Sequence, residues 1–136
     1  MAVAAKAGAV RKGRILLMDD EELVRTIVGI MIGTLGHEVE FAENGEEAVA
    51  KYREALSSGR RFDIVILDLT IRDGIGGEET LEKLLKLDPE VKAVVSSGYT
   101  DSATISEYRS RGFSACLTKP YEVEALGAVL NVLLKE

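Results

Sequence analysis

The sequence predicts an α/β fold: a doubly wound parallel sheet of five strands with helices on both faces. Short apolar runs alternate along the chain with segments of helical periodicity, which is typical of β/α units. The run Ile64–Leu67 contains no polar residue, as in a strand that is covered on both faces. Parallel strands joined by helices need right-handed crossovers, and at this chain length we expect the strand order 2-1-3-4-5.

Length and charge limit the possible functions. A chain of 136 residues can form one domain with a substantial core, and we expect residues 1–12 to be a flexible tail or linker and residues 13–136 to be the domain. The net charge of −6 and the interspersed charges argue against direct nucleic-acid binding. The single cysteine excludes an internal disulfide and fits a reducing compartment, so we expect a cytoplasmic location. The apolar stretch Leu23–Leu35 is too short to span a membrane.

The first half of the chain contains three predicted strands and two predicted helices. The strands are Ile15–Met18, His37–Phe41 and Ile64–Leu67, and the helices are Glu21–Leu35 and Gly45–Leu56. The first helix has acids in its first turn, which suits the helix dipole, and Gly36 ends it. The second carries apolar residues at helical spacing.

The second half adds two strands and three helices. They are the helix Glu78–Leu87, the strand Val91–Ser97, the helix Ser102–Arg111, the strand Phe113–Thr118 and the helix Glu122–Leu134. Asp88-Pro89 breaks the first of these helices, and Gly112 is expected to close the second. The last helix has an apolar stripe.

Polar residues follow four of the five predicted strands. They are Asp19 and Asp20 after the first strand, Asp68 after the third, Ser97 as the last residue of the fourth and Lys119 after the fifth. In the flavodoxin-like order 2-1-3-4-5 the first and third strands are neighbours, and the second, which ends without such a group, lies on the outside. The carboxyl ends of parallel strands share one edge, so these side chains are expected to form one site.

The predicted site suits phosphoryl transfer to an aspartate. Clustered carboxylates raise each other's pKa unless a cation lies among them, and a partly open set of oxygen ligands favours Mg²⁺. Asp68 would be the nucleophile, the ammonium of Lys119 and the hydroxyl of Ser97 would contact the phosphoryl oxygens, and Gly98 would leave room for the group.

These residues, in this order and spacing, resemble the receiver domains of two-component phosphorelays. The resemblance runs from about Arg14 to the C-terminus, and the stretches LDLTI and SSGY look most like receivers at the C-terminus of hybrid sensor histidine kinases. It implies that Asp68 accepts a phosphoryl group from a phosphohistidine. It also implies that Asp20, Asp68 and the backbone carbonyl of Thr70 hold Mg²⁺, with Asp19 assisting through water. Lys119 would pair with the phosphoryl group, Ser97 would move toward it, and the Lys119-Pro120 bond would be cis.

The resemblance also assigns tuning positions, and the sequence departs from the family at two places. The side chains of Thr70 and Tyr99 would flank the path of the attacking water, so a bulky Tyr99 should lengthen the life of the phosphorylated state. Arg72 stands where proline is common, which leaves the loop after Asp68 less fixed. Cys116 stands where the family keeps a tyrosine or phenylalanine whose rotamer reports phosphorylation, which puts the usual switch in doubt. Cys116 should lie under the fourth helix, on the face opposite Phe113.

Other readings stay open at this point. An aspartyl-nucleophile, Mg²⁺-dependent phosphatase would need a second acid two residues after Asp68, where this chain has Thr70. A flavodoxin-like electron carrier would need a phosphate cradle after the first strand, where the sequence DDEE would repel phosphate. A module of the same fold that is never phosphorylated is another alternative. Asp73, in the following loop, is the rival nucleophile.

The expected partners follow from the resemblance. They are a sensor histidine kinase or a phosphotransfer protein, with no direct contact to nucleic acid or membrane. Such a domain catalyses its own phosphorylation and dephosphorylation without being a multi-turnover enzyme. The sequence does not choose between a stand-alone protein and a part of a hybrid kinase.

Overall fold

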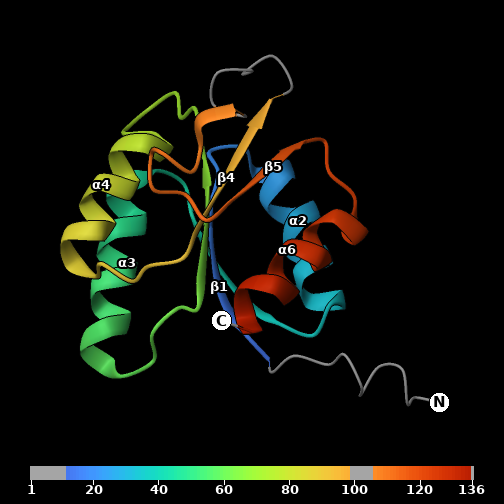
Figure 1. Ribbon diagram of the computed structural model, residues 1–136, viewed down its shortest axis with the longest axis horizontal. Helices are drawn as coiled ribbons and strands as arrows, with labels where there is room; N and C mark the ends of the chain where they lie inside the picture. Colours follow the sequence, from blue (N-terminus) through green and yellow to red (C-terminus); the bar gives the residue numbers. More distant parts are fainter. Residues whose placement is uncertain (1–11, 99–105, 136) are drawn as a thin grey trace.

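The computed structural model describes residues 12–98 and 106–135 and has the predicted architecture (Figure 1). Its strands are β1 (Arg14–Met18), β2 (Glu38–Ala42), β3 (Ile64–Asp68), β4 (Ala93–Gly98) and β5 (Ala115–Lys119). Its helices are α2 (Glu22–Thr34), α3 (Gly45–Ser58), α4 (Gly77–Leu87) and α6 (Val123–Lys135). All four strand pairings are parallel, in the order β2-β1-β3-β4-β5. The fold class predicted from the sequence is therefore confirmed.

The sheet separates two apolar layers, because successive side chains of a strand point to opposite faces. Helices α3 and α4 cover one face, and α2 and α6 cover the other (Figure 1). All five residues of β3 are buried, as expected for the central strand. The layers hold β3 in place, so the carboxylate at its end has a fixed position.

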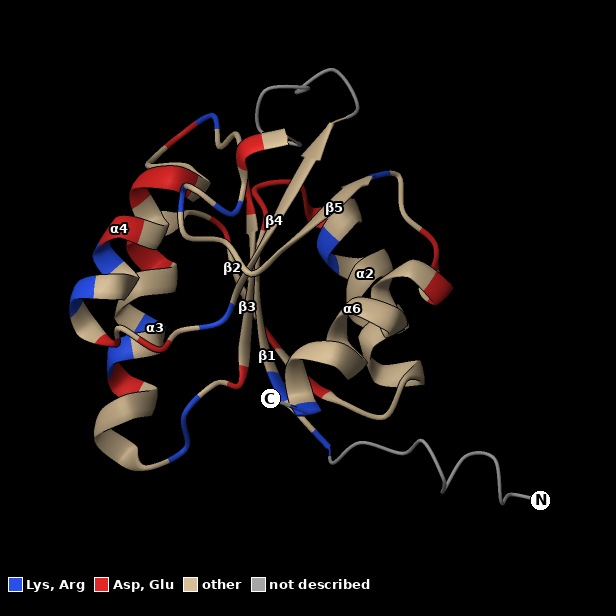
Figure 2. Cartoon of the chain, in the orientation of Figure 1, with Lys and Arg blue, Asp and Glu red and all other residues tan. Residues whose placement is uncertain are grey.

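Charge is distributed unevenly over the two helical layers. Glu residues and basic residues are interspersed along α3 and α4, whereas α2 and α6 carry few charged residues (Figure 2). Three large apolar side chains of α2 are exposed, namely Leu23, Ile27 and Ile30. Within the described ranges, no helix combines the length and the apolar character needed to cross a bilayer.

The predicted helix Ser102–Arg111 is the element that differs most. Residues 102–105 lie outside the described part of the chain, and only Ser106 and Glu107 of the rest are helical. From Tyr108 the chain turns, and Gly112 closes the turn with a φ of 103°. The N–H of Phe113 donates to the carbonyl of Tyr108 at 3.0 Å, so these residues form a helix-ending motif rather than a further helical turn. Extending this helix to Arg111 was therefore wrong, while the stop at Gly112 is confirmed.

The predicted position of Phe113 was also wrong. The fifth strand begins at Ala115 rather than at Phe113, so the alternation of side chains does not extend back that far. Phe113 packs with the α3 and α4 layer, to which Cys116 also belongs, while Ala115 and Leu117 pack with the α2 and α6 layer. Cys116 does lie on the predicted face, but Phe113 shares that face with it.

Candidate functional site

The register of the sheet brings the polar strand ends together. Asp68 is opposite Ser96 on the neighbouring strand, and Gly98 is opposite Lys119. Asp19 follows β1 directly, and its backbone N–H donates to the carbonyl of Ala42 at 3.0 Å. The residues predicted from separate strand ends therefore lie at one edge of the sheet.

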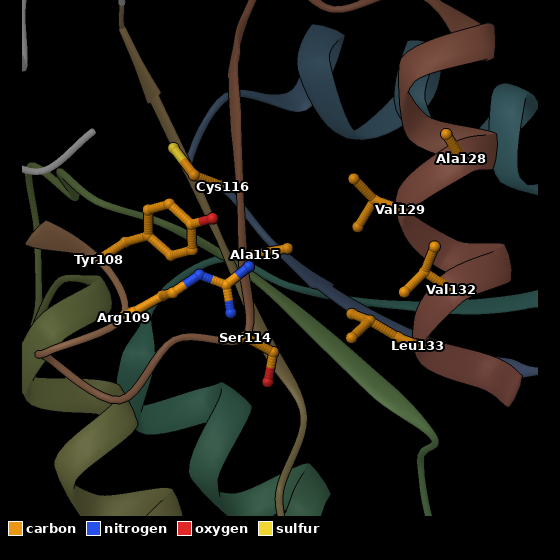
Figure 3. Close-up of a pocket in the computed structure, with 9 residues that line it drawn as sticks. All are labelled: Tyr108, Arg109, Ser114, Ala115, Cys116, Ala128, Val129, Val132 and Leu133. Atoms are coloured by element: carbon orange, nitrogen blue, oxygen red, sulfur yellow. The ribbon is translucent and has the colours of Figure 1, made fainter. Parts of the chain in front are cut away.

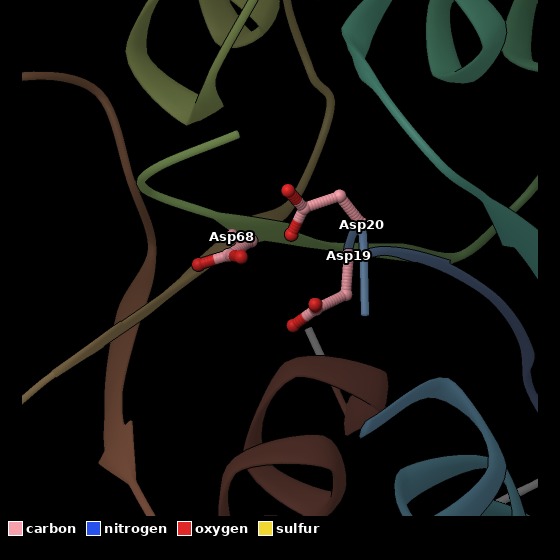
Figure 4. A group of neighbouring side chains, drawn as sticks. All are labelled: Asp19, Asp20 and Asp68. Carbon is pink, nitrogen blue, oxygen red and sulfur yellow. The ribbon is translucent and has the colours of Figure 1, made fainter. Parts of the chain in front are cut away.

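Three carboxylates form the centre of this edge (Figure 4). Asp19, Asp20 and Asp68 each offer an oxygen, and these oxygens lie within 4.8 Å of one another. Asp19 and Asp68 are buried, with 1% and 7% of their surface exposed, whereas Asp20 is partly exposed. Carboxylates alone form a hard, all-oxygen donor set with an open side, so this cluster fits Mg²⁺.

Lys119 bridges the two buried acids. Its Nζ donates to Asp19 Oδ2 at 2.8 Å and lies 3.3 Å from Asp68 Oδ1. Burial alone would lower the pKa of Lys119, but the hydrogen bond to Asp19 and the charge of Asp68 raise it overall. Lys119 therefore stays an ammonium ion and neutralises part of the cluster. The peptide bond between Lys119 and Pro120 is cis, as the resemblance implied.

Burial and neighbouring charges both act on the carboxylate of Asp68. Burial raises its pKa from the ordinary 3.8 to about 6, and the charge of Asp19 adds to the effect. Lys119 and the backbone N–H of Thr70, which donates to the carboxylate, act in the opposite direction. The ionised form of Asp68 is thus held in the fold at a cost in stability when no metal is bound.

This cost gives a testable dependence of stability on pH. Because the folded pKa exceeds the unfolded one, the destabilisation is complete above about pH 6 and disappears as the pH falls toward 3.8. The shift corresponds to roughly 1–3 kcal/mol of free energy of unfolding. Asp68→Asn should therefore stabilise the metal-free protein by about that amount at neutral pH. Urea unfolding in EDTA across this pH range measures it, and an advantage that did not shrink on acidification would contradict the assignment.

Arg72 contacts the exposed acid of the cluster. Its backbone N–H donates to Asp20 Oδ2 at 3.0 Å, and its Nε donates to the same oxygen at 3.2 Å. Burial raises the pKa of Asp20, but these hydrogen bonds and the positive charge of Arg72 outweigh burial and lower it. The sequence singled out Arg72 only as a departure from the family, and nothing in its spacing indicated Asp20 as its partner.

An open cavity of about 360 Å³ lies over the cluster. It is lined by Asp20, Glu21, Asp68, Leu69, Thr70, Arg72, Ser97, Gly98 and Lys119. The hydroxyl of Ser97 is buried beside it and forms no hydrogen bond within the described residues. Asp73 is exposed and does not line the cavity. Tyr99, the predicted tuning residue, lies outside the described residues.

Cys116 lines a second depression of the surface (Figure 3). This depression, of about 490 Å³, has Tyr108 and Arg109 on one side and residues of α6 on the other. Burial raises the pKa of the Cys116 thiol, and its contact with Ser97 only partly offsets that rise. The thiol therefore stays protonated at neutral pH, which fits a packing role better than a reactive one.

The comparisons with known proteins match this geometry. Residues 15–131 match the family model described as the response regulator receiver domain. The chain belongs to the response regulator receiver family. The match covers most of the chain, including the strand ends that carry the acids and Lys119.

Relatives of this receiver chain include small and large proteins. The chemotaxis protein CheY of Thermotoga maritima is 31% identical over 90% of this chain and 98% of its own length. The transcriptional regulatory protein ZraR of Klebsiella oxytoca is 28% identical, and the match covers 88% of this chain and 26% of ZraR.

Solved structures show the same pattern. The receiver domain of NtrX from Brucella abortus superposes with a TM-score of 0.80 at 27% identity, over 89% of this chain and 98% of that one. A structure of NtrX with a longer chain has a TM-score of 0.82 at 26% identity, but the match spans 92% of this chain and only 27% of NtrX. The receiver domain of NtrX has thus been solved both by itself and as part of a longer chain.

Proposed function

We propose that this receiver domain accepts a phosphoryl group on Asp68 from the phosphohistidine of a sensor histidine kinase or phosphotransfer protein, in a Mg²⁺-dependent reaction in the cytoplasm. The observation that carries this proposal is the position of Asp68. Its carboxylate lines an open cavity, with the oxygens of two further acids within 4.8 Å and the ammonium of Lys119 at 3.3 Å.

The reaction follows from these contacts. An ionised oxygen of Asp68 attacks phosphorus, the phosphorus–nitrogen bond of the donor breaks, and the imidazole keeps the electron pair. Asp20, Asp68 and the backbone carbonyl of Thr70 would hold Mg²⁺, with Asp19 assisting through water, and the ion would supply positive charge for the phosphoryl oxygens. Lys119 supplies a second cation, and the unpartnered hydroxyl of Ser97 is available to donate to one of those oxygens.

The surface beside the cavity supports a helical protein partner. Leu23, Ile27 and Ile30 on α2 are 70%, 46% and 65% exposed, an unusual amount of apolar surface for one helix. A groove of about 170 Å³ runs from α2 to Lys119 and Pro120. A donor helix with an apolar face could cover this surface and bring its phosphohistidine to Asp68.

Labelling with a small phosphodonor tests the proposal. Incubation with acetyl phosphate and Mg²⁺ should add one phosphoryl group per chain, visible in the mass of the intact protein. Hydroxylamine should remove it, because an acyl phosphate is cleaved by that nucleophile. EDTA should prevent the labelling. A mass that stays unchanged under all donor conditions, or a label that resists hydroxylamine, would count against Asp68 as the acceptor.

Cys116 leads to a prediction about the response to phosphorylation. A thiol cannot swing between buried and exposed positions as an aromatic ring does, so beryllofluoride, which mimics the phosphoryl group, should shift the amide signals of Ser97 strongly. The amide signals of Ser106–Arg111 and β5 should shift less than they would if an aromatic ring at position 116 changed its rotamer. Large shifts along both segments that persist in Cys116→Ala would show that another element drives a full rearrangement.

A further inference from the structure

Arg72 holds the one acid of the cluster that is not tied to Lys119. Asp19 and Asp68 both contact the ammonium of Lys119, whereas Asp20 Oδ2 accepts from the backbone N–H and the Nε of Arg72. Each of the three acids of the cluster therefore has a cationic neighbour before any metal binds. The side-chain contact of Arg72 with Asp20 is a feature of this chain in addition to the fold and the three acids.

The backbone around Arg72 is anchored independently of its side chain. The N–H of Leu69 donates to the carbonyl of Ser96 at 2.9 Å, and the N–H of Gly45 donates to the carbonyl of Ile75 at 3.1 Å. These bonds fix both sides of the loop, so the backbone contact of residue 72 with Asp20 should persist when the side chain changes. The guanidinium can therefore leave Asp20 without unfolding the loop.

The guanidinium of Arg72 reduces the net negative charge that the acid cluster offers to a metal ion. Three carboxylates face two cationic side chains, which leaves a formal charge of −1 for a metal to neutralise. Without Arg72 the charge would be −2. A metal ion on Asp20 would also lie close to the guanidinium and be repelled by it.

We propose that the side chain of Arg72 competes with Mg²⁺ for Asp20 and so sets the metal affinity of this receiver domain. The inference rests on the proposed metal site and adds a determinant of its affinity. Its size is limited, because the Arg72 side chain is 73% exposed and exposed ion pairs contribute at most about fivefold to an equilibrium constant. Arg72→Ala should thus bind Mg²⁺ about three- to fivefold more tightly.

Titration calorimetry with Mg²⁺ measures this effect, and Arg60→Ala is the matched control. Arg60 is also exposed, at 66%, and also pairs with one acid, Glu38, at 3.5 Å. It precedes β3, whereas Asp68 ends that strand, so it is separated from the site by more than a Debye length at physiological salt. Arg60→Ala should leave the affinity unchanged, and the advantage of Arg72→Ala should narrow as salt is added.

Each outcome separates the competition from the metal site itself. Tighter binding in Arg72→Ala alone supports the competition. If the wild type binds Mg²⁺ and Arg72→Ala binds it with the same or a lower affinity, the competition is overturned but the metal site stands. An equal gain of affinity in Arg60→Ala has the same meaning. Failure of the wild type to bind Mg²⁺ overturns both.

A second readout follows Arg72 directly. In spectra of the wild type, the Nε–H signal of Arg72 should shift on addition of Mg²⁺ and exchange faster with water, because its bond to Asp20 is lost. The Nε–H signal of Arg60 should stay in place. An Arg72 signal that does not respond at saturating Mg²⁺ would overturn the proposed release.

Discussion

Asp68→Asn is expected to abolish phosphorylation by acetyl phosphate in the presence of Mg²⁺. Asparagine has nearly the same shape, so the cavity keeps its form, but the neutral amide lacks the anionic oxygen that attacks phosphorus. The measurement is the mass of the intact protein over time. The variant should remain folded and, when metal-free, should be more stable than the wild type at neutral pH, so loss of labelling cannot be attributed to unfolding.

Asp73→Asn is the matched control for this experiment. Asp73 lies five residues along the same loop region, but it is exposed and does not line the cavity. It should be labelled like the wild type. Labelling that survived in Asp68→Asn and failed in Asp73→Asn would reassign the nucleophile.

Lys119→Met is expected to slow labelling by roughly 100-fold, the usual cost of removing one donor aimed at developing charge. Methionine keeps much of the volume of the lysine stem but has no cation. The variant should also raise the pKa of Asp68 further, since Lys119 acts to lower it, so less of the nucleophile is ionised at neutral pH. Initial rates at saturating Mg²⁺ give the comparison.

Lys92→Met controls for the loss of a partly buried lysine. Lys92 precedes β4, at the edge of the sheet opposite the acids, and its Nζ donates to the carbonyl of Leu133 at 2.7 Å. Its replacement should leave the labelling rate within about twofold of the wild type, as for a site that does not share partners with the acids. A Lys119→Met protein that was labelled at the rate of Lys92→Met would remove Lys119 from the reaction.

The sequence predicted the elements whose pattern is local and strong. β3 is recognisable because a central parallel strand is apolar at every position, and the acids were found because they stand directly after such strands. The edge of the sheet then follows from topology, since parallel strands place their carboxyl ends together. For these reasons the positions of Asp19, Asp20, Asp68 and Lys119 could be predicted without coordinates.

Features that depend on tertiary contacts could not be predicted. The pairing of Arg72 with Asp20 joins residues 52 positions apart in the chain and leaves no periodic trace in the sequence. The turn that ends at Gly112 replaces a helical turn because Phe113 packs into the α3 and α4 layer and its N–H bonds back to Tyr108. For the same reason, the predicted fifth strand began two residues too early, at Phe113 instead of Ala115.

Lys119 lines both the cavity over Asp68 and the groove that leads to α2. A partner that occupied the groove would therefore contact the same residue whose ammonium lies 3.3 Å from Asp68 Oδ1. By linkage, if phosphorylation of Asp68 changes the affinity of such a partner, the bound partner changes the equilibrium constant for phosphorylation by the same factor. Lys119 is the residue through which this coupling would act, because it lines both the cavity and the groove.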